Sequence, residues 1–546
     1  MGSPAMTLGR IIARMLFPTG DSKAIAAQQQ VQSEIDEYLV TEQQRQRLIP
    51  RAALAGAAAG VIAVVFRIAL QSMDAMRNTI AAWAHQIPAW GWIFPVAFCS
   101  VTATASVYVV RKFAPEASGS GIPHLKAVLH KLRELRSMRI LVVKFIGGLL
   151  GLGSGMAIGR EGPTVQIGGA VSDLVAKRAG TTSPERMTLI VAGAGAGLAA
   201  AFNAPLAGFI FVLEEVQRDF RPSMFAAALI AAVVADVITR LAAGQAPVFV
   251  IPNYPALSLT ALPAFIALGL FCGFFGVLYN KLLLRTLDAY ALLKGRALFV
   301  AVAVVGAVAG VVTWLNPIYA GGGHAMTEQI LAGQVLSSAI PALLLFRLTF
   351  MLASYGTGAA GGIFAPLLVL GALVGLGIGR LGQWLAPGVV TQPEVFAIVG
   401  MAALFTAVVR APLTCIVLLV EMTNSYTQML PLLVTCFCAY IVAEYLKDLP
   451  IYEALLKRDL EEGGYPDVSE PKVVELEIAP HSPFSGKLVS DLGLPAGCLL
   501  VKVREGDREW VPLASTRLLA HQRITAVVSP EAEGGLDALH AGCNAI

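Results

Sequence analysis

The chain has 546 residues, of which 56% are hydrophobic and only 14% are charged, and its formal net charge is +4. Soluble domains carry about 25% charged residues, so this composition excludes an ordinary soluble domain. Uncharged runs long enough to cross a hydrocarbon layer of about 30 Å as helices occupy residues 89–110, 261–279, 297–315 and 361–379. The sequence therefore predicts an all-α, multi-pass membrane protein.

The N-terminal segment, residues 1–49, lacks the continuous apolar core of a cleaved signal peptide. Residues 21–48 are polar and helix-prone, so we expect an amphipathic helix on the membrane surface. The seven cysteines of the chain form no Cys-x-x-Cys pair, and five lie in apolar segments. This distribution favours buried free thiols over a disulfide framework.

The membrane domain, residues 50–460, contains an internal repeat. Residues 191–215 align with residues 398–422 at an offset of 207, and residues 159–163 align with residues 362–366 at an offset of 203. The alignment predicts repeat halves at about 50–243 and 258–447, as in transporters whose halves are related by a pseudo-two-fold axis. It leaves open whether the repeats are parallel or inverted.

Glycine and proline mark several helix starts inside the apolar sequence: "GSGIP" (119–123), "GREGP" (159–163) and "GGIFAP" (361–366). Proline suits the first helical turn, and glycine lets the backbone turn tightly and approach a ligand. Because a helix N-terminus presents free N–H groups and a positive dipole end, convergence of these starts would create a small-anion site. The Ser120 hydroxyl would be a further donor there. Alternatively, these residues are packing glycines and kinks.

Glu161 is a carboxylate in otherwise apolar surroundings, where an ionised group costs about 3 kcal/mol or more. An ionised Glu161 could occupy the position of a bound anion and leave it on protonation, which would link anion occupancy to a proton. The alternative is a structural ion pair with Arg160 or Lys144.

Glu215 and Tyr452 are two further candidates. Glu215 ends an apolar helix and could pass protons from the cytoplasm toward Glu161, although an ordinary solvated helix end is an equal alternative. Tyr452 begins the last helix of the membrane domain, and its phenol could donate a hydrogen bond to an anion. A tyrosine near a membrane interface is more often an anchor.

Taken together and in this order, "GSGIP", "GREGP", "FNAPLAG…LEE", "GGIFAP", "RAPLT…VEM" and the late tyrosine resemble the CLC family of chloride channels and chloride/proton antiporters. The resemblance implies an inverted-repeat fold of tilted and broken helices, and a homodimer with an anion pathway in each subunit. By motif, it implies a central anion site formed by two side chains and two backbone N–H groups: Ser120 and Tyr452, and Ile363 and Phe364.

The resemblance also implies a subtype. A serine in "GSGIP" is typical of chloride-selective members. Glu161 would be the external gating glutamate and Glu215 the internal proton-transfer glutamate, and having both favours an antiporter over a passive, gated chloride channel of the same fold. One departure is His124, where the family usually has glutamate. Its imidazole could add pH dependence, or it is a tolerated polar substitution.

The composition becomes charged and soluble after about residue 458, and residues 470–546 are predicted to form a small α+β unit. This unit resembles the regulatory C-terminal RCK (TrkA-C) domain of bacterial potassium-transport proteins, not the CBS pair of eukaryotic CLC proteins. The resemblance implies dimerisation and a small regulatory ligand; a dimer-stabilising module without a ligand is the alternative.

These observations predict chloride transport coupled to proton antiport across the cell (inner) membrane, with both termini in the cytoplasm. We expect no enzymatic activity, because the chain has no HExxH, P-loop or nucleophile-elbow motif. The expected partners are chloride, protons, the lipid bilayer and a second copy of the chain. No required cofactor, metal or nucleic acid is expected.

Overall fold

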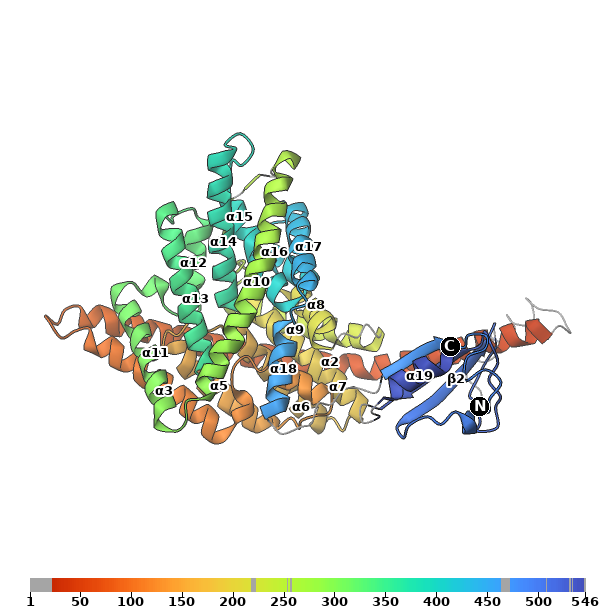
Figure 1. Cartoon of the computed structure of the whole chain (residues 1–546). Helices are drawn as coiled ribbons and strands as arrows, with labels where there is room; N and C mark the ends of the chain where they lie inside the picture. Colours follow the sequence, from red (N-terminus) through yellow and green to blue (C-terminus); the bar gives the residue numbers. More distant parts are fainter. Residues whose placement is uncertain are drawn as a thin grey trace. The chain divides into compact units, whose positions relative to one another are not determined.

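A computed structural model of the chain describes residues 22–217, 222–252, 254–255, 258–462, 472–506, 508–529, 532 and 534–544 (Figure 1). The chain divides into two compact units, Met1–Leu456 and Lys457–Ile546. The first unit is helical, and the second contains the sheet.

The membrane unit consists of two series of helices followed by one last helix. The first series is α2 (Ser22–Ala84), α3 (Ile93–Phe113), α4 (Ile122–Leu129), α5 (Ser137–Gly153), α6 (Glu161–Arg178), α7 (Ser183–Phe202), α8 (Pro205–Phe211) and α9 (Pro222–Ala243), with a π turn, η2 (Val212–Val216), after α8. The second series is α10 (Leu262–Ala291), α11 (Arg296–Leu315), α12 (His324–Leu331), α13 (Ile340–Gly356), α14 (Phe364–Leu385), α15 (Pro393–Val409), α16 (Pro412–Thr423) and α17 (Met429–Tyr445). The last helix, α18 (Ile451–Glu462), crosses the boundary between the units.

Eight helices of the described part are long and apolar enough to cross a membrane, and three further apolar helices are shorter. The four uncharged runs noted in the sequence fall in α3, α10, α11 and α14. Within the described residues, the prediction of a multi-pass helical protein is therefore confirmed.

The first helix is longer than the amphipathic segment expected at residues 21–48. α2 continues without a break from Ser22 through Pro50 to Ala84. Residues 1–21, and the side chains before residue 46, lie outside the described part, so the amphipathic character of this segment stays a prediction.

The internal repeat extends through both series of helices. α3 corresponds to α11, α4 to α12, α5 to α13, α6 to α14, α7 to α15 and α8 to α16. Unusual backbone conformations recur at equivalent points: Gly121 and Gly323 precede α4 and α12 with φ of 81° and 91°. Asn203 and Arg410 end α7 and α15 with φ of 51° and 68°. The same backbone breaks are thus built twice.

Two glutamates establish that the repeats are inverted. Glu214, after α8, accepts hydrogen bonds from the first N–H groups of α16, including Thr414 N–H at 2.7 Å. Its repeat mate Glu421, near the end of α16, accepts hydrogen bonds from N–H groups at the start of α8, including Ala207 N–H at 2.8 Å. Each helix therefore begins where the other ends, which makes the equivalent helices antiparallel. The question left open by the alignment is settled in favour of inversion.

Close glycine contacts hold the paired helices together. A Cβ atom on Gly168 of α6 would lie 2.2 Å from the carbonyl oxygen of Gly193 in α7. In the other repeat, a Cβ on Gly371 of α14 would lie 2.5 Å from the carbonyl oxygen of Gly400 in α15. Small residues allow this backbone approach between helices in an apolar solvent, and they explain why Gly193 and Gly400 align.

The C-terminal unit is a four-stranded antiparallel sheet with one helix. Its elements are β1 (Lys472–Glu477), β2 (Cys498–Glu505), β3 (Arg508–Trp510), β4 (Arg523–Val528) and α19 (Gly535–Cys543), and the strand order is β1-β4-β2-β3. Ile478, Val503, Ile524 and Leu539 form its separate apolar core. The predicted α+β class is confirmed. The seven cysteines of the chain are free thiols.

Candidate functional site

The starts of α6 and α14 meet in the interior of the membrane unit. The N–H of Gly159 donates to the carbonyl of Gly362 and the N–H of Gly362 donates to the carbonyl of Gly159, both at 2.7 Å. This reciprocal pair joins "GREGP" to its repeat mate "GGIFAP". A Cβ on Gly362 would lie 3.1 Å from the backbone nitrogen of Gly162, so the two segments are in close contact.

The start of α4 joins them from a third direction. A Cβ on Gly162 would lie 2.8 Å from both the Cα and the Cβ of Ser120, which places "GSGIP" directly against "GREGP". Ser120 is buried, and its hydroxyl is 3.4 Å from the N–H of Ile122, which donates to it. The structure thus brings together the three helix starts that the sequence singled out.

Lys144 holds the segment that precedes α4. Its buried ammonium donates to the carbonyl of Ala117 at 2.9 Å and to that of Gly119 at 2.7 Å. These two hydrogen bonds fix the turn before Ser120. Lys144 is therefore not the ion-pair partner of Glu161, which the sequence had left as an alternative.

Tyr355, on α13, is an additional neighbour of Ser120. Its hydroxyl would lie 3.0 Å from a Cβ on Gly119, and its phenol hydrogen-bonds with Ser120. Nothing in the local sequence singles out this tyrosine, because α13 reaches the site only through the repeat packing. Gly358, three residues after Tyr355 and with φ of 77°, marks only the turn that follows the helix.

The backbone N–H groups of Ile363 and Phe364 are available donors. Both residues are fully buried at the start of α14, and no hydrogen bond of the described residues uses their N–H groups. A helix leaves its first N–H groups without an intrahelical partner, so this start presents unsatisfied donors to whatever lies in front of it.

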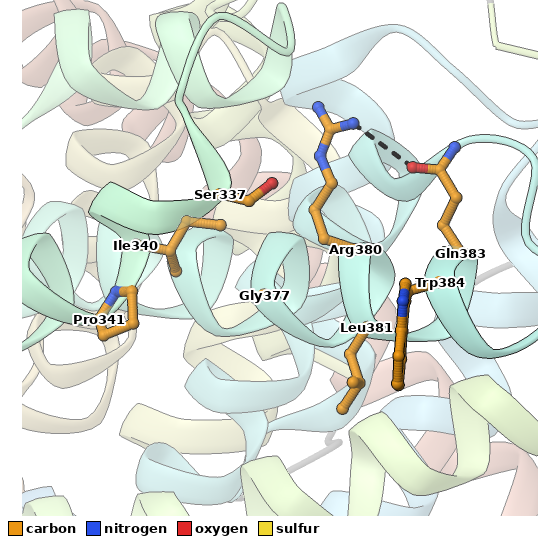
Figure 2. Close-up of a pocket in the computed structure, with 8 residues that line it drawn as sticks. All are labelled: Ser337, Ile340, Pro341, Gly377, Arg380, Leu381, Gln383 and Trp384. Atoms are coloured by element: carbon orange, nitrogen blue, oxygen red, sulfur yellow. Dashed lines mark hydrogen bonds between the residues drawn. The ribbon is translucent and has the colours of Figure 1, made fainter.

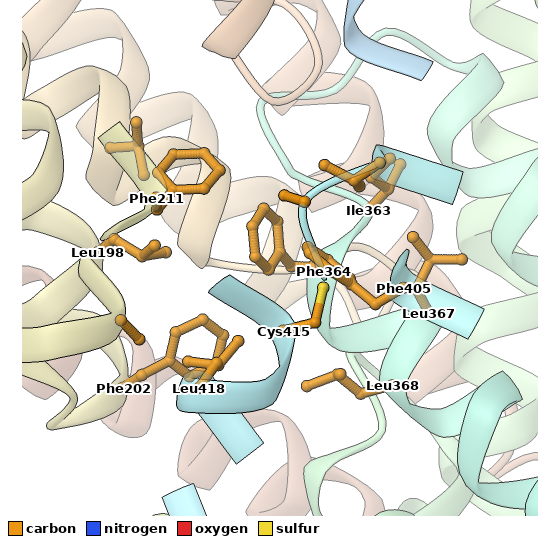
Figure 3. Close-up of a cluster of buried hydrophobic side chains, with 14 of the residues drawn as sticks. Leu198, Phe202, Phe211, Ile363, Phe364, Leu367, Leu368, Phe405, Cys415 and Leu418 are labelled. Atoms are coloured by element: carbon orange, nitrogen blue, oxygen red, sulfur yellow. The ribbon is translucent and has the colours of Figure 1, made fainter. Parts of the chain in front are cut away.

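The ring of Phe364 belongs to a buried aromatic cluster (Figure 3). Its centroid lies 4.2 Å from that of Phe405, 5.8 Å from that of Phe211 and 6.1 Å from that of Phe202. The Tyr452 ring stacks at 6.5 Å on the same phenylalanine. These contacts fix the start of α14 in position.

Tyr452 is the second residue of α18 and is fully buried. Among the described residues its hydroxyl has no hydrogen-bond partner. Burial excludes the alternative of a membrane-interface anchor, because an anchor keeps its hydroxyl in the wet headgroup region. What remains is a buried phenol with an unused donor.

Glu161 is the first residue of α6, and its side chain is only 3% exposed. Its Oε1 lies 4.0 Å from Arg160 Nε, the outer limit of an ion pair, and the N–H of Ala365 also donates to the carboxylate. Its Oε2 has no hydrogen-bond partner within the described part of the chain. The Glu161 carboxylate thus has the Arg160 side chain at the limit of an ion pair, and backbone N–H groups of both helix starts as further donors.

A cavity of about 420 Å³ reaches Glu161. Its lining includes Gly159, Glu161 and the start of α12, together with Arg67, Arg77 and Arg160. Asp74, also in the lining, pairs with Arg77 at 2.6 Å. The lining thus has three arginines and two carboxylates, and this excess of positive charge favours the entry of anions.

Glu215 lies in the π turn after α8 and is fully buried. Its Oε1 accepts a hydrogen bond from Lys126 Nζ at 2.8 Å. The alternative of a solvated helix end is therefore wrong, because the wider π turn rotates this side chain into the protein. The neighbouring Glu214 instead caps α16, as described above.

His124, on α4, is buried at 5% exposure. Its Nδ1 lies 3.3 Å from the side-chain nitrogen of Gln166 on α6. This contact gives His124 a structural partner next to "GREGP", while its effect on pH dependence stays a prediction.

A surface pocket of about 600 Å³ lies apart from these residues, along the second half of α14 (Figure 2). Arg380 lines it, within 3.5 Å of Gln383 and in an ion pair with Glu394 at 2.9 Å. None of the predicted site residues contributes to its lining. In the part of the chain that the structure describes, no group of three or more histidine, cysteine or acidic side chains is placed to hold a metal ion.

Inverted repeats of broken helices, whose N-termini meet at a buried site, are typical of membrane transport proteins. The family model described as "Voltage gated chloride channel" matches residues 102–444. The chain therefore belongs to this family, the CLC family, and the predicted family and fold class are confirmed. A TrkA-C domain model matches residues 473–539, as predicted for the C-terminal unit.

The chain is similar to the H(+)/Cl(-) exchange transporter ClcA of Vibrio parahaemolyticus, with 40% identity over 420 residues, 75% of this chain and 89% of that protein. It is 38% identical to the ClcA transporter of Klebsiella pneumoniae over 75% of this chain and 88% of that one. Among solved structures, a slow cyanobacterial Cl-/H+ antiporter matches with a TM-score of 0.74 and 35% identity over 77% of this chain and 99% of that chain. A eukaryotic CLC transporter, with a TM-score of 0.67 and 21% identity over 84% of this chain and 79% of that one, supports the fold alone.

Proposed function

We propose that this protein exchanges chloride for protons across the membrane, with Glu161 as the external gate and Glu215 as the internal proton-transfer residue. The observation that carries the proposal is the position of the Glu161 carboxylate, held by backbone donors where the starts of α6 and α14 meet and bordering a cavity. The likeness to proteins named as H(+)/Cl(-) exchange transporters supports it.

The anion site is built from neutral donors. The hydroxyls of Ser120 and Tyr452 and the N–H groups of Ile363 and Phe364 replace the water that chloride loses on entering the protein. Neutral donors and helix dipoles stabilise the anion without a full positive charge, so the ion is bound and can still leave. This selection of ligands rests on the unused donors of Tyr452 and of the start of α14.

Coupling follows from competition for one position. An ionised Glu161 carboxylate uses backbone donors at the joined helix starts, including Ala365 N–H, and its negative charge repels an incoming chloride. Protonation removes its charge, so chloride displaces it. Tyr452 lies close enough to interact electrostatically with both Glu161 and Glu215, which supports a central site between the two glutamates.

Assembly and location complete the proposal. The protein lies in the cell (inner) membrane as a homodimer with its termini in the cytoplasm. The TrkA-C domain is its regulatory part and takes a small ligand.

Reconstitution in liposomes tests the exchange. With a chloride gradient as the only driving force, protons move uphill through the unaltered protein, and Glu161→Gln abolishes this movement. Chloride flux without any proton movement in the unaltered protein overturns the proposal and identifies a passive channel.

A further inference from the structure

We propose that Lys126 and Glu453 form a proton relay that connects the inner aqueous side to Glu215. This inference rests on the proposed function, because it supplies the path by which protons reach the internal glutamate. Neither Lys126 nor Glu453 belongs to a motif recognised in the sequence. The two residues are 327 positions apart in the chain and lie on different helices.

The relay consists of three side chains from three elements. Lys126 lies on α4, Glu215 in the π turn after α8, and Glu453 on α18. Lys126 Nζ is 2.8 Å from Glu215 Oε1 and 2.5 Å from Glu453 Oε1. The single ammonium therefore donates to both carboxylates, and each carboxylate is one proton transfer away from Lys126.

The exposure of the three side chains indicates the order in which a proton would pass through them. The side chain of Glu453 is 23% exposed, that of Lys126 is 4% exposed, and that of Glu215 is fully buried. Water therefore reaches Glu453 and not Glu215. A proton that enters from solution binds first to Glu453, and the lysine separates this entry point from the interior.

The charge of the cluster favours one exchangeable proton. Lys126 contacts two carboxylates, and each of the two glutamates also makes further interactions. Two carboxylates close to one ammonium repel one another, which favours the binding of a proton by one of them. Because the groups are in contact, the proton belongs to the cluster and not to one residue.

Other charged groups lie on the same elements. His130 and Arg133 follow α4, and Arg458 lies one helical turn beyond the glutamate on α18; each of them makes further polar interactions. Lys126 alone contacts both carboxylates in the described structure.

The transfer step is balanced. The Lys126 ammonium first gives one of its protons to the Glu215 carboxylate, and the neutral amine that forms then accepts the proton of protonated Glu453. Glu453 ends as a carboxylate, Lys126 is again an ammonium, and Glu215 becomes a neutral acid. A lysine can perform this exchange because its ammonium loses a proton in a buried site, whereas an arginine guanidinium does not.

A purely structural role is the alternative, in which Lys126 only holds Glu215 in place. Lys126→Arg separates the two readings, because arginine keeps the positive charge and the hydrogen bonds but does not release a proton. Glu453→Gln tests the entry point with a side chain of the same shape, and Glu453→Asp keeps a carboxyl group there. Glu394→Gln, which breaks the remote pair with Arg380, controls for the general effect of losing an ion pair.

The experiment measures proton and chloride flux together in liposomes that contain the full-length protein. We expect Glu453→Gln and Lys126→Arg each to lower the proton-to-chloride ratio by about 100-fold, the lower end of the range for a single acid–base group, while Glu453→Asp and Glu394→Gln retain it. A dependence of proton flux on inner pH that is unchanged in Glu453→Gln, or a normal ratio in Lys126→Arg, overturns the relay.

The same measurements separate this inference from the proposed function. If Glu215→Gln lowers the ratio but Glu453→Gln does not, the exchange stands and the relay is wrong. If the unaltered protein moves no protons, or Glu215→Gln has no effect, the proposed function itself fails and the relay fails with it.

Discussion

Gly162→Ala tests whether the starts of α4 and α6 form one site. The added Cβ would lie 2.8 Å from the Cα and the Cβ of Ser120 and 2.9 Å from its carbonyl oxygen. Ordinary contacts begin near 3.4 Å, so the two segments must separate by about 0.6 Å. Two of the three atoms belong to the backbone, which cannot move aside by a change of rotamer. Overpacking of this kind costs about 1–3 kcal/mol of stability.

The same displacement moves the Ser120 hydroxyl away from the start of α14. Because errors of about 1 Å in a preorganised site cost about 100-fold in rate, we expect chloride flux to fall by about 10-fold or more. The assay is chloride efflux from liposomes at matched protein content, with thermal unfolding measured in detergent. Gly388→Ala is the control, since its added Cβ meets nothing within 4 Å. If Gly162→Ala transports chloride as fast as this control, the contact is not tight and the common site is wrong.

Three further predictions concern separate parts of the chain. Ser120→Pro removes a hydroxyl from the proposed anion site and should raise nitrate transport relative to chloride transport; unchanged selectivity in a competition flux assay removes Ser120 from that proposal. Glu421→Ala leaves the start of α8 without its cap and should lower stability by about 1–2 kcal/mol, seen as a lower unfolding temperature, whereas an unchanged temperature contradicts the capping role. Burial raises the pKa of the Cys543 thiol from 9.0 to about 11, so the folded C-terminal unit should lose stability as the pH rises from about 9 to about 11, because the unfolded chain releases this proton first. Alkylation of Cys543 at pH 9 should accordingly be slow until the unit is unfolded, and rapid labelling of the folded protein would refute the assignment.

The sequence alone predicted those structural features whose formation depends on residues close together in the chain. Apolar runs, the Gly–Pro helix starts and the alternating strands of the C-terminal unit each have a period or a turn residue that can be recognised. The burial of Glu215 has no such mark. An acidic residue after an apolar helix resembles a solvated end, and only the π turn together with Lys126, 89 positions earlier, makes it an interior group.

The alignment could not predict the inversion of the repeats either. It compares residue types and carries no information on the direction in which the helices run in space. It became visible through contacts between distant segments. Glu214 and Glu421 align with one another in the sequence, and each looks like a helix-end carboxylate. Their reciprocal caps show that the two helices run in opposite directions. The functional role assigned to each site residue stays a prediction, because the geometry places side chains together without moving an ion through them.

The pseudo-two-fold relation explains why the proposed anion site would have one gating carboxylate and not two. Glu161 and Phe364 are the first residues of α6 and α14, and they occupy equivalent positions on joined helix starts. Phe364 is enclosed by aromatic rings, whereas Glu161 borders the cavity. Two carboxylates at equivalent positions would repel one another, and one of them would stay protonated. With phenylalanine on one side, the proposed site would have N–H donors from both helix starts and a competing carboxylate on only one of them.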